Sequence, residues 1–276
     1  MNTILMSVLT VILFVISAAA QHQYIHNPDL RKKPVYTYLH DALQQKETAA
    51  VLNLRERGIT ELSDSIGLLT NLRYLNVQKN KLRLLPQSIG QLQNLEVIIL
   101  RGNAFSSMPD EFYTLRSLRE IDAESNHIPA IPSEIATLSA IERIDLTNNQ
   151  ISQIHPSIGK CTKLKILEVD KNLLTLIPDV LGTLPNLELF LASDNKITQI
   201  PDQIFSAKKL KTLNLDFNAI SVIPAAIQKS KGLKILTLSN NALTSIPEEL
   251  CQCTSLELLV LSNNKITSLP KNIGKL

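Results

Sequence analysis

The chain has 276 residues, a formal net charge of +3, 44% hydrophobic residues and no tryptophan. It is long enough to bury a large core, and its small net charge gives no reason to expect nucleic acid or an anionic membrane as a partner. Leucine and isoleucine supply most of the apolar content, which favours a repeated small module over an irregular enzyme core.

The first twenty residues differ from the rest of the chain. Residues 4–20 carry no charge, and their apolar stretch runs into Ser17 and three alanines. A short apolar region followed by small residues is typical of a secretory signal peptide, here with cleavage before Gln21. The alternative is an uncleaved anchor, although the segment is at the lower limit for a membrane span. We interpret residues 1–20 as a signal peptide and expect export, periplasmic or secreted.

Two segments precede the repeats that are described next. Residues 21–33 are polar and are expected to form a loose tail. Pro34 then opens a segment with apolar residues at helical spacing, among them Leu39 and Leu43. Because an array of repeats needs a cover over its first unit, we expect residues 34–47 to form an N-terminal capping helix.

From residue 48 to the end the sequence repeats every 23 residues, in ten units of which the last is one residue short. Arg57 takes the central slot of the first unit, and an asparagine takes it in the other nine. The asparagines are Asn80, Asn103, Asn126, Asn149, Asn172, Asn195, Asn218, Asn241 and Asn264. A proline recurs six residues after the asparagine in most units, starting with Pro86. We conclude that residues 48–276 form ten repeats of one module.

Each slot of the unit has a physical reason. Leu75 and Val77 alternate with polar neighbours, which predicts a short strand. Leu85, Ile89 and Leu92 follow at intervals of four and three, which predicts a helical or 3-10 return that the proline opens. Asparagine carries a donor and an acceptor on a short side chain. Stacked asparagines can therefore bond buried backbone groups of their own and of the neighbouring turn, as a structural ladder.

The pattern L-x-x-L-x-L-x-x-N-x-L followed by L-P-x-x-I resembles the leucine-rich repeat in its 23-residue form, over 229 of the 276 residues. The resemblance implies an α/β solenoid that is curved, with a parallel β-sheet on the concave side and short helical or 3-10 returns on the convex side. It also implies a binding role without naming a ligand. This repeat form is found in exported bacterial proteins and in cytosolic scaffolds of the Ras-signalling type.

The three cysteines are expected to be unpaired. Cys161 and Cys253 occupy a slot that leucine fills in other units, and four repeats separate them. That is about 19 Å at the strand spacing, too far for a disulfide, while Cys251 lies in the same return as Cys253. Free thiols are unusual in an oxidising compartment. They favour the alternative of a cytoplasmic signalling scaffold.

No group of residues in the sequence suits catalysis or cofactor binding. The chain has no phosphate-binding glycine loop and no G-x-S-x-G motif. His22 and His26 fall in the predicted tail without a third metal ligand, and His155 takes a proline slot. We therefore expect no cofactor, no metal and no enzymatic activity, with an enzyme that has a concave-face site as the remote alternative.

The outward strand positions on the predicted concave side are acidic in the middle of the array. They are Glu120, Asp122, Glu124, Asp145, Glu168 and Asp170, with Arg143 as the lone opposing charge. Like charges on neighbouring strands destabilise a sheet, which favours a patch for a basic or metal-bridged partner. The alternative is a solvated surface that tolerates the cluster.

Towards the C-terminus the same columns turn apolar. They hold Ile166, Leu189, Leu191, Ile235, Leu258 and Val260, with Phe217 at a nearby turn. An exposed apolar strip of this extent favours a contact surface, although aliphatic residues also favour strands for their own sake. We expect the two regions together to bind a protein partner, whose identity the sequence does not give.

The last unit runs from Leu256 to Leu276, and no polar terminal repeat or second capping helix follows it. An uncapped end leaves an edge strand and one side of an apolar row open to water. We expect fraying of this repeat, self-association through the ends of two molecules, or a longer product.

Overall fold

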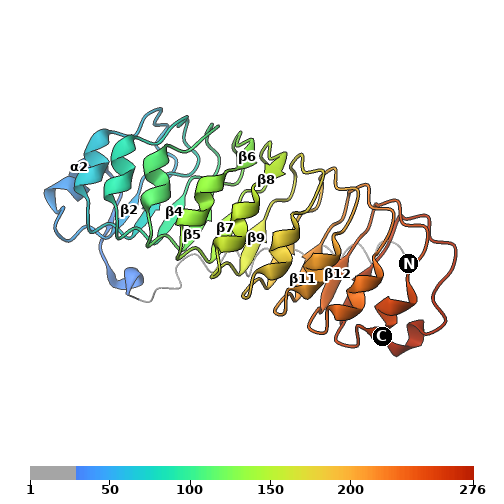
Figure 1. The fold of residues 1–276 in the computed structure, drawn as a ribbon. Coiled ribbons are helices and arrows are strands. Elements are labelled where there is room, and N and C mark those ends of the chain that lie inside the picture. Colours follow the sequence, from blue (N-terminus) through green and yellow to red (C-terminus); the bar gives the residue numbers. More distant parts are fainter. Residues whose placement is uncertain (1–28) are drawn as a thin grey trace.

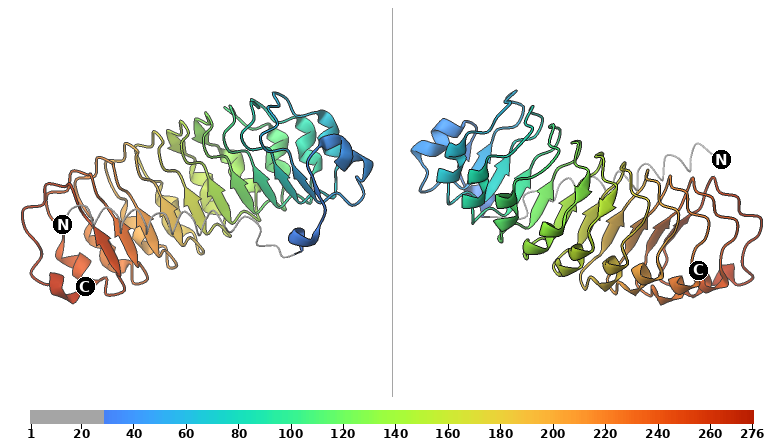
Figure 2. Two further views of the ribbon diagram at one scale, coloured as in Figure 1. Left: turned by 180° about the vertical axis from the view of Figure 1, so that it is seen from behind. Right: turned by 45° about the horizontal axis from the view of Figure 1, so that its top comes forward.

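The computed structural model describes residues 29–276, which form one elongated array of repeats (Figure 1). Each repeat consists of a short strand, a turn and a 3-10 segment that leads to the next strand. Two further views show the strands together on one side and the 3-10 segments on the other (Figure 2). The predicted signal peptide and residues 21–28 of the predicted tail lie outside the described residues.

The main sheet is parallel, with eleven strands in the order β1-β2-β3-β4-β5-β7-β9-β10-β11-β12-β13 within the described chain. The strands are β1 (Val35–Tyr36), β2 (Val51–Asn53), β3 (Tyr74–Asn76), β4 (Val97–Ile99), β5 (Glu120–Asp122), β7 (Arg143–Asp145), β9 (Ile166–Glu168), β10 (Leu189–Leu191), β11 (Thr212–Asn214), β12 (Ile235–Thr237) and β13 (Leu258–Val260). Leu75 pairs with Ile98, 23 residues further on, and later strands keep this register. Two further strands, β6 (Ala130–Ile131) and β8 (Gln153–Ile154), form a separate parallel pair. The predicted α/β solenoid is confirmed.

The return segments are 3-10 helices, as follows: η3 (Asp64–Leu68), η4 (Gln87–Gln91), η5 (Asp110–Thr114), η6 (Ser133–Thr137), η7 (Pro156–Lys160), η8 (Asp179–Thr183), η9 (Asp202–Ser206), η10 (Ala225–Lys229) and η11 (Glu248–Gln252), with η2 (Leu30–Lys32) before the repeats and η12 (Ile273–Lys275) in the last. Pro86 precedes η4 with φ of −67°, the value that its ring fixes. Where His155 takes this slot, its Nδ1 accepts a hydrogen bond from the Ser157 amide and Pro156 opens the helix.

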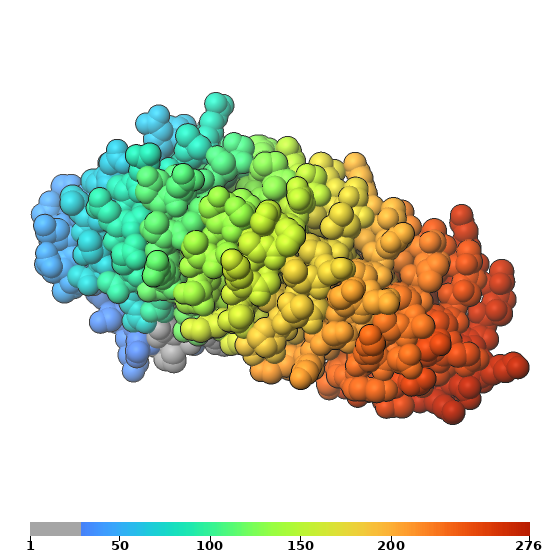
Figure 3. All heavy atoms as spheres, viewed as in Figure 1, coloured from blue at the N-terminus to red at the C-terminus, as the bar shows by residue number. Residues whose placement is uncertain are grey.

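The core lies between the sheet and the 3-10 segments and continues from repeat to repeat. In one unit Leu72, Leu75, Leu82 and Ile89 are fully buried, and the same slots are filled along the array. In the space-filling view the repeats pack against one another without a break (Figure 3). Each unit therefore buries its apolar residues mainly against its neighbours, as a solenoid requires.

The asparagine of each turn bonds its own repeat and the preceding one. Asn172 donates from Nδ2 to the carbonyls of Val169 (3.1 Å) and Leu146 (3.0 Å), and its Oδ1 accepts from the Ile151 amide (2.9 Å). Leu146 and Ile151 belong to the preceding repeat. The same pattern recurs from Asn80 to Asn264. These bonds satisfy buried backbone groups that the turn leaves without a partner in the sheet.

The residue before each asparagine has a left-handed backbone. At Lys171 φ is 53°, and the same slot holds residues as different as Phe217, Asn148 and Gly102, all with positive φ. Only this conformation turns the chain sharply enough after the strand, and none of the occupants is β-branched, which is the type that tolerates positive φ least. The backbone conformation of this position is thus constrained, whereas its side chain varies from repeat to repeat.

The N-terminal cover differs from the expected single helix over residues 34–47. The segment begins with β1, whose Val35 and Tyr36 pair with Val51 and Leu52 of the first repeat, and continues with the six-residue helix α2 (Leu39–Gln44). The prediction of one long helix was wrong in extent, because the free edge of β2 is better satisfied by backbone pairing than by a helix laid across it. Leu30 of the predicted loose tail is buried against Ala50 and Val51.

In the last repeat the apolar row is only partly covered. Leu256, Leu259, Leu261 and Ile266 are half-buried against the core, and Leu269 is 65% exposed. The Glu248 carboxylate of the preceding repeat accepts hydrogen bonds from the Lys271 amide and from Nδ2 of Asn272.

We expect the Asn172→Ala variant to lose about 1–3 kcal/mol of unfolding free energy, because it leaves the buried Ile151 amide without its side-chain acceptor and removes one donor from each of the Leu146 and Val169 carbonyls. Urea unfolding followed by circular dichroism measures this loss. The matched control is Asn94→Ala, since Asn94 is exposed and makes one hydrogen bond, to the Thr70 carbonyl. Equal losses in the two variants would show that the ladder does not carry this stability.

Candidate binding face

The outward side of the main sheet, called the sheet face below, is built from three columns of side chains that run across the repeats. The first and third residues of a strand point outward and the middle one inward, as with Tyr74, Leu75 and Asn76 in β3. The third column comes from the residue two positions after the strand, such as Gln78. Neighbouring strands lie about 4.8 Å apart, so members of one column touch.

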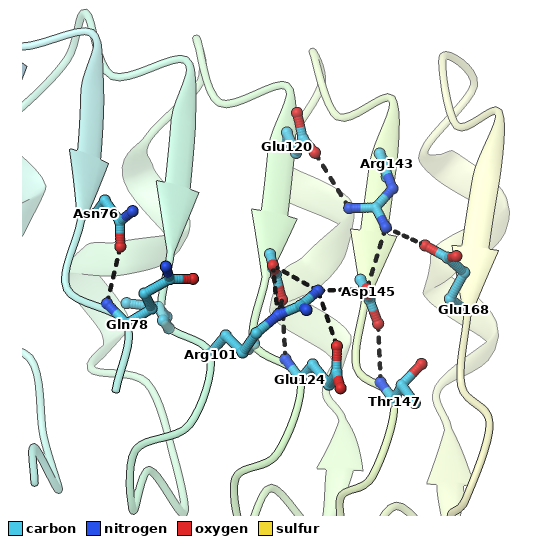
Figure 4. A network of polar contacts seen from close by, with 12 residues as sticks. Asn76, Gln78, Arg101, Glu120, Glu124, Arg143, Asp145, Thr147 and Glu168 are labelled. Atoms are coloured by element: carbon cyan, nitrogen blue, oxygen red, sulfur yellow. Dashed lines mark hydrogen bonds and ion pairs between the residues drawn. The ribbon is translucent and has the colours of Figure 1, made fainter. Parts of the chain in front are cut away.

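Arg143 of β7 lies among three carboxylates from three strands (Figure 4). Its Nη1 is 3.1 Å from Oε1 of Glu120, and its Nη2 is 3.1 Å from Oδ2 of Asp145. Nη2 also donates a hydrogen bond to Oε2 of Glu168. One guanidinium thus joins β5, β7 and β9, because its several planar donors reach different carboxylates at once.

A second arginine, Arg101, follows β4 and forms ion pairs with further carboxylates. Its Nη2 lies 2.8 Å from Oε2 of Glu124, 3.1 Å from Oδ2 of Asp122 and 3.6 Å from Oδ2 of Asp145. The prediction that Arg143 is the lone opposing charge was therefore wrong. Arg101 stands in the third column one repeat before Glu124, outside the three repeats that hold the predicted acidic residues. We call these two arginines with Glu120, Asp122, Glu124, Asp145 and Glu168 the ion-pair cluster.

The ion-pair cluster is largely buried. The exposed fraction is 2% for Asp122, 4% for Asp145 and 6% for both Arg143 and Glu168. The alternative of a solvated surface does not fit this burial, because side chains at strand spacing cover one another and turn towards the two guanidinium groups. With five carboxyls against two arginines, the cluster carries a formal charge of −3 when every carboxyl is ionised.

Burial changes the proton affinity of these carboxyls. Burial first, and then the charge of Asp145, raise the pKa of Glu168 to about 8, against the opposing effect of Arg143. The same two causes raise the pKa of Asp122, and burial raises the pKa of Glu120 and of Glu124. A buried carboxyl among other carboxyls costs less free energy in its neutral, protonated form than in its charged, desolvated form.

Asp170 and Asp216 stand in the third column and are held by serines of the next repeat. Oδ1 of Asp170 accepts from both the amide and Oγ of Ser193, each at 2.6 Å, and Oδ1 of Asp216 accepts from the Ser239 amide at 2.6 Å. Burial raises the pKa of each aspartate to about 6. Sequence reasoning placed Asp170 in the acidic patch and missed Asp216, although both occupy the same slot two repeats apart.

Three carboxylates of the cluster come close enough to hold a cation. One oxygen each from Asp122, Glu124 and Asp145 lies within 4.8 Å of the other two. Nη2 of Arg101 contacts all three residues, so the arginine supplies positive charge at this point. The geometry is that of an ion-pair network within the sheet face.

The apolar columns are more shielded than expected. Leu191 and Val260 are buried, at 8% and 7% exposed, so the prediction that they are exposed was wrong. Ile166, Leu189, Ile235 and Leu258 are half-buried. Phe217 is 57% exposed in the turn after β11, beside the columns. The half-buried members still present apolar edges to anything that lies on the sheet face.

A pocket of about 310 Å³ opens on the sheet face towards the N-terminal side of the cluster. It is lined by Arg55, Tyr74, Asn76, Gln78, Ile99, Arg101 and Asp122. Figure 4 shows Asn76, Gln78 and Arg101 of this lining. Its volume is within the range of small-ligand sites, and its lining mixes polar groups with an aromatic ring. Sequence analysis does not predict this pocket, because its lining residues come from β3, β4 and β5 and from the turns between repeats.

The comparisons with known proteins agree with this architecture. Family models of leucine-rich repeats match residues 70–128, 139–197 and 189–243, and a model of two copies matches 231–273. The chain belongs to the leucine-rich-repeat family, whose domains are typically non-catalytic protein-binding modules. Among curated proteins, none matches this chain.

Solved structures with the same fold include plant receptors. The plant peptide hormone receptor RGFR1 in complex with RGF2 is 25% identical with a TM-score of 0.70, over 88% of this chain and 44% of the receptor. The ectodomain of the Arabidopsis thaliana receptor kinase GASSHO1/SCHENGEN3, in complex with CASPARIAN STRIP INTEGRITY FACTOR 2, is 27% identical with a TM-score of 0.60, over 78% and 30%. The functional domain of InlJ from Listeria monocytogenes, at 23% identity and a TM-score of 0.70 over 85% and 49%, shows the fold alone. This chain spans less than half the length of each of these three.

We expect the unfolding free energy to fall as the pH rises from about 5 to about 8, by on the order of 1–3 kcal/mol. The sign follows from the raised pKa values of Glu168, Asp170 and Asp216. Between the ordinary and the raised pKa, the folded state holds more protons than the unfolded state, so rising pH favours unfolding.

The Glu168→Gln variant should show a shallower decline with pH, measured by urea unfolding at several pH values. Glu142→Gln is the control, because Lys165 and Arg119 outweigh partial burial and lower the pKa of Glu142. The control should decline at least as steeply as the wild type. Parallel curves for the wild type and Glu168→Gln would contradict the assignment.

Proposed function

We propose that this chain is an exported, non-catalytic recognition module that binds a protein or peptide on the sheet face. The observation that carries the proposal is the combination on one face of an open pocket of about 310 Å³ and a row of half-buried aliphatic side chains. Recognition sites of this kind combine apolar contact with a few polar groups that fix orientation. The plant peptide hormone receptor RGFR1, whose structure is known in complex with RGF2, supports it by likeness of fold.

The layout of the sheet face defines what kind of partner fits it. At one end the pocket offers the Arg55 guanidinium and the Gln78 amide, and at the other Ile235 and Leu258 offer apolar contact. The ion-pair cluster lies between them and is compensated largely from within. A segment with a polar group at one end and aliphatic side chains at the other therefore matches the face better than the strongly basic partner that the acidic residues first suggested.

The same face excludes partners that would have to pull the cluster apart. Pulling Arg143 away from Glu120, Asp145 and Glu168 leaves a buried charge without its partners, which costs about 3–5 kcal/mol. A bound segment thus gains more by lying over the cluster than by competing for its arginines.

Export rests on the signal-peptide pattern of residues 1–20, and the receptor ectodomain of similar fold supports it. The three cysteines are free and buried, and burial raises the pKa of Cys161 to about 11, which protects the thiol from oxidation. Their lack of partners therefore does not oppose an oxidising destination. Within residues 29–276, none of the helices has the length and apolar run that a membrane crossing requires.

N-terminal sequencing of the mature protein separates export from the alternative of an intracellular signalling scaffold. A start at Gln21 is the expected result. A retained Met1 would contradict export and support the scaffold.

Selection of binders from a displayed random-peptide library tests the binding face. We expect the Ile235→Lys and Gln78→Ala variants to weaken the selected peptides by about tenfold, since each removes a contact worth roughly 1.4 kcal/mol. Titration calorimetry or fluorescence anisotropy measures the change.

The controls carry matched substitutions, aliphatic to lysine and glutamine to alanine, on the opposite side of the solenoid. Leu68→Lys lies at the exposed end of η3, and Gln91→Ala lies at the exposed end of η4. Both should leave binding unchanged. If the controls weaken binding as much as the sheet-face variants do, the binding site lies elsewhere.

A further inference from the structure

The loops that join a 3-10 segment to the next strand differ sharply in charge along the array. Residues 160–165, 206–211 and 229–234 hold three lysines each, and the equivalent loop 183–188 holds a single glutamate. Nine lysines against one glutamate give these four loops a formal charge of +8. We call the nine lysines the basic rim. All of them are exposed.

The concentration of charge is specific to these repeats. The equivalent residues of five other repeats, 68–73, 91–96, 114–119, 137–142 and 252–257, hold three arginines and three glutamates, a formal charge of zero. The whole chain carries only +3, so everything outside the four loops sums to −5. The small net charge therefore conceals a strongly polarised molecule.

Backbone hydrogen bonds hold the loops of the basic rim side by side. The Lys234 amide donates to the Lys211 carbonyl, and the Lys211 amide donates to the Glu188 carbonyl, each at 2.8 Å. The Glu188 amide in turn donates to the Lys165 carbonyl at 2.8 Å. At the strand spacing, Lys165 and Lys234 are thus about 14 Å apart along the solenoid axis. The lysines form rows at the N-terminal ends of the strands, at the border of the sheet face.

Only part of this charge is neutralised within the described chain. Lys165 pairs with Glu142, Lys211 with Glu188 and Lys234 with Glu257, each at 2.6 Å. For the other six lysines the described residues give no ion pair, and Lys209 donates to Oδ1 of Asn186. The protein's own carboxylates therefore leave most of the rim available to an external anion.

We propose that the basic rim binds a linear anionic polysaccharide, which lies along the solenoid across successive loops. A polymer with many anionic groups meets lysines of three repeats that the 23-residue register brings into line, and it gains from releasing its counterions. Between the lysines the exposed residues are small and polar, such as Thr162, Ser206 and Gly232. A rod-like polar chain can lie against such a surface without steric obstruction.

Two other polyanions fit the rim less well. A membrane surface is usually held by lysines together with large apolar side chains that enter the bilayer. Among the described residues, the exposed large hydrophobics of these repeats, such as Leu173 and Val222, lie in the turns that follow the strands, at the opposite border. Single-stranded nucleic acid is held by stacking on aromatic rings, and the loops of the rim contain none.

Binding of a heparin decasaccharide, measured by calorimetry on the mature protein at about 0.15 M salt, tests the proposal. We expect the K208Q/K209Q/K231Q variant to bind at least about tenfold more weakly and to show a reduced slope of affinity against salt. The control K81Q/K196Q/K265Q removes the same charge from exposed lysines in turns that follow the strands. It should bind within about twofold of the wild type.

All six lysines are exposed, so we expect both variants to keep the fold. Thermal unfolding of the two variants checks this. Equal weakening by the two variants would mean that only net charge matters and would overturn the proposal, as would an absence of heparin binding by the wild type. Tighter binding to single-stranded DNA, or to vesicles of phosphatidylcholine and phosphatidylserine, would overturn it in favour of those partners. The result is independent of peptide binding on the sheet face, because no rim lysine lines the pocket.

Discussion

The structure depends on how one side-chain amide in each repeat satisfies the backbone of the turn. A strand of three residues cannot bond the turn that follows it, and a solenoid core offers no water to those groups. Asn172 and its equivalents bond a carbonyl of their own turn and both a carbonyl and an amide of the preceding one. The left-handed residue before the asparagine brings it to that position. Strand register, core and sheet face all follow from this fixed turn.

Fixed register has a cost on the sheet face. Because every strand repeats at 23 residues, Asp122, Asp145 and Glu168 fall beside one another with no freedom to shift. The sheet accommodates them through Arg101 and Arg143 and through raised proton affinity rather than through solvation. A similar accommodation holds Asp170 with Ser193, whose amide and hydroxyl both point at one carboxylate oxygen. Register thus converts a pattern of acidic residues into a buried network.

The sequence predicted whatever the 23-residue period controls and little else. The strands, the 3-10 returns and the asparagine slots recur, so one unit stands for all. The strand β1, the pair of β6 with β8, and the pairing of Arg101 occur once each, and no period indicates them. Burial on the sheet face was misjudged for Asp122, Leu191 and Val260, because alternation along one strand says which way a side chain points but not how far its neighbours cover it. The pocket beside Gln78 was unforeseen for the same reason.

The asparagine bonds also give the array a direction. Each amide reaches back to the preceding turn and none reaches forward, so the Ile151 amide gains its acceptor only once Asn172 is in place. On a growing polypeptide, a turn therefore closes one repeat after it has been synthesised, and the folded front trails the point of chain extension by about 23 residues. When the array assembles from the N-terminus towards the C-terminus, every completed turn already has its backbone hydrogen bonds. The strand β1 and the helix α2 supply the template on which the first repeat folds.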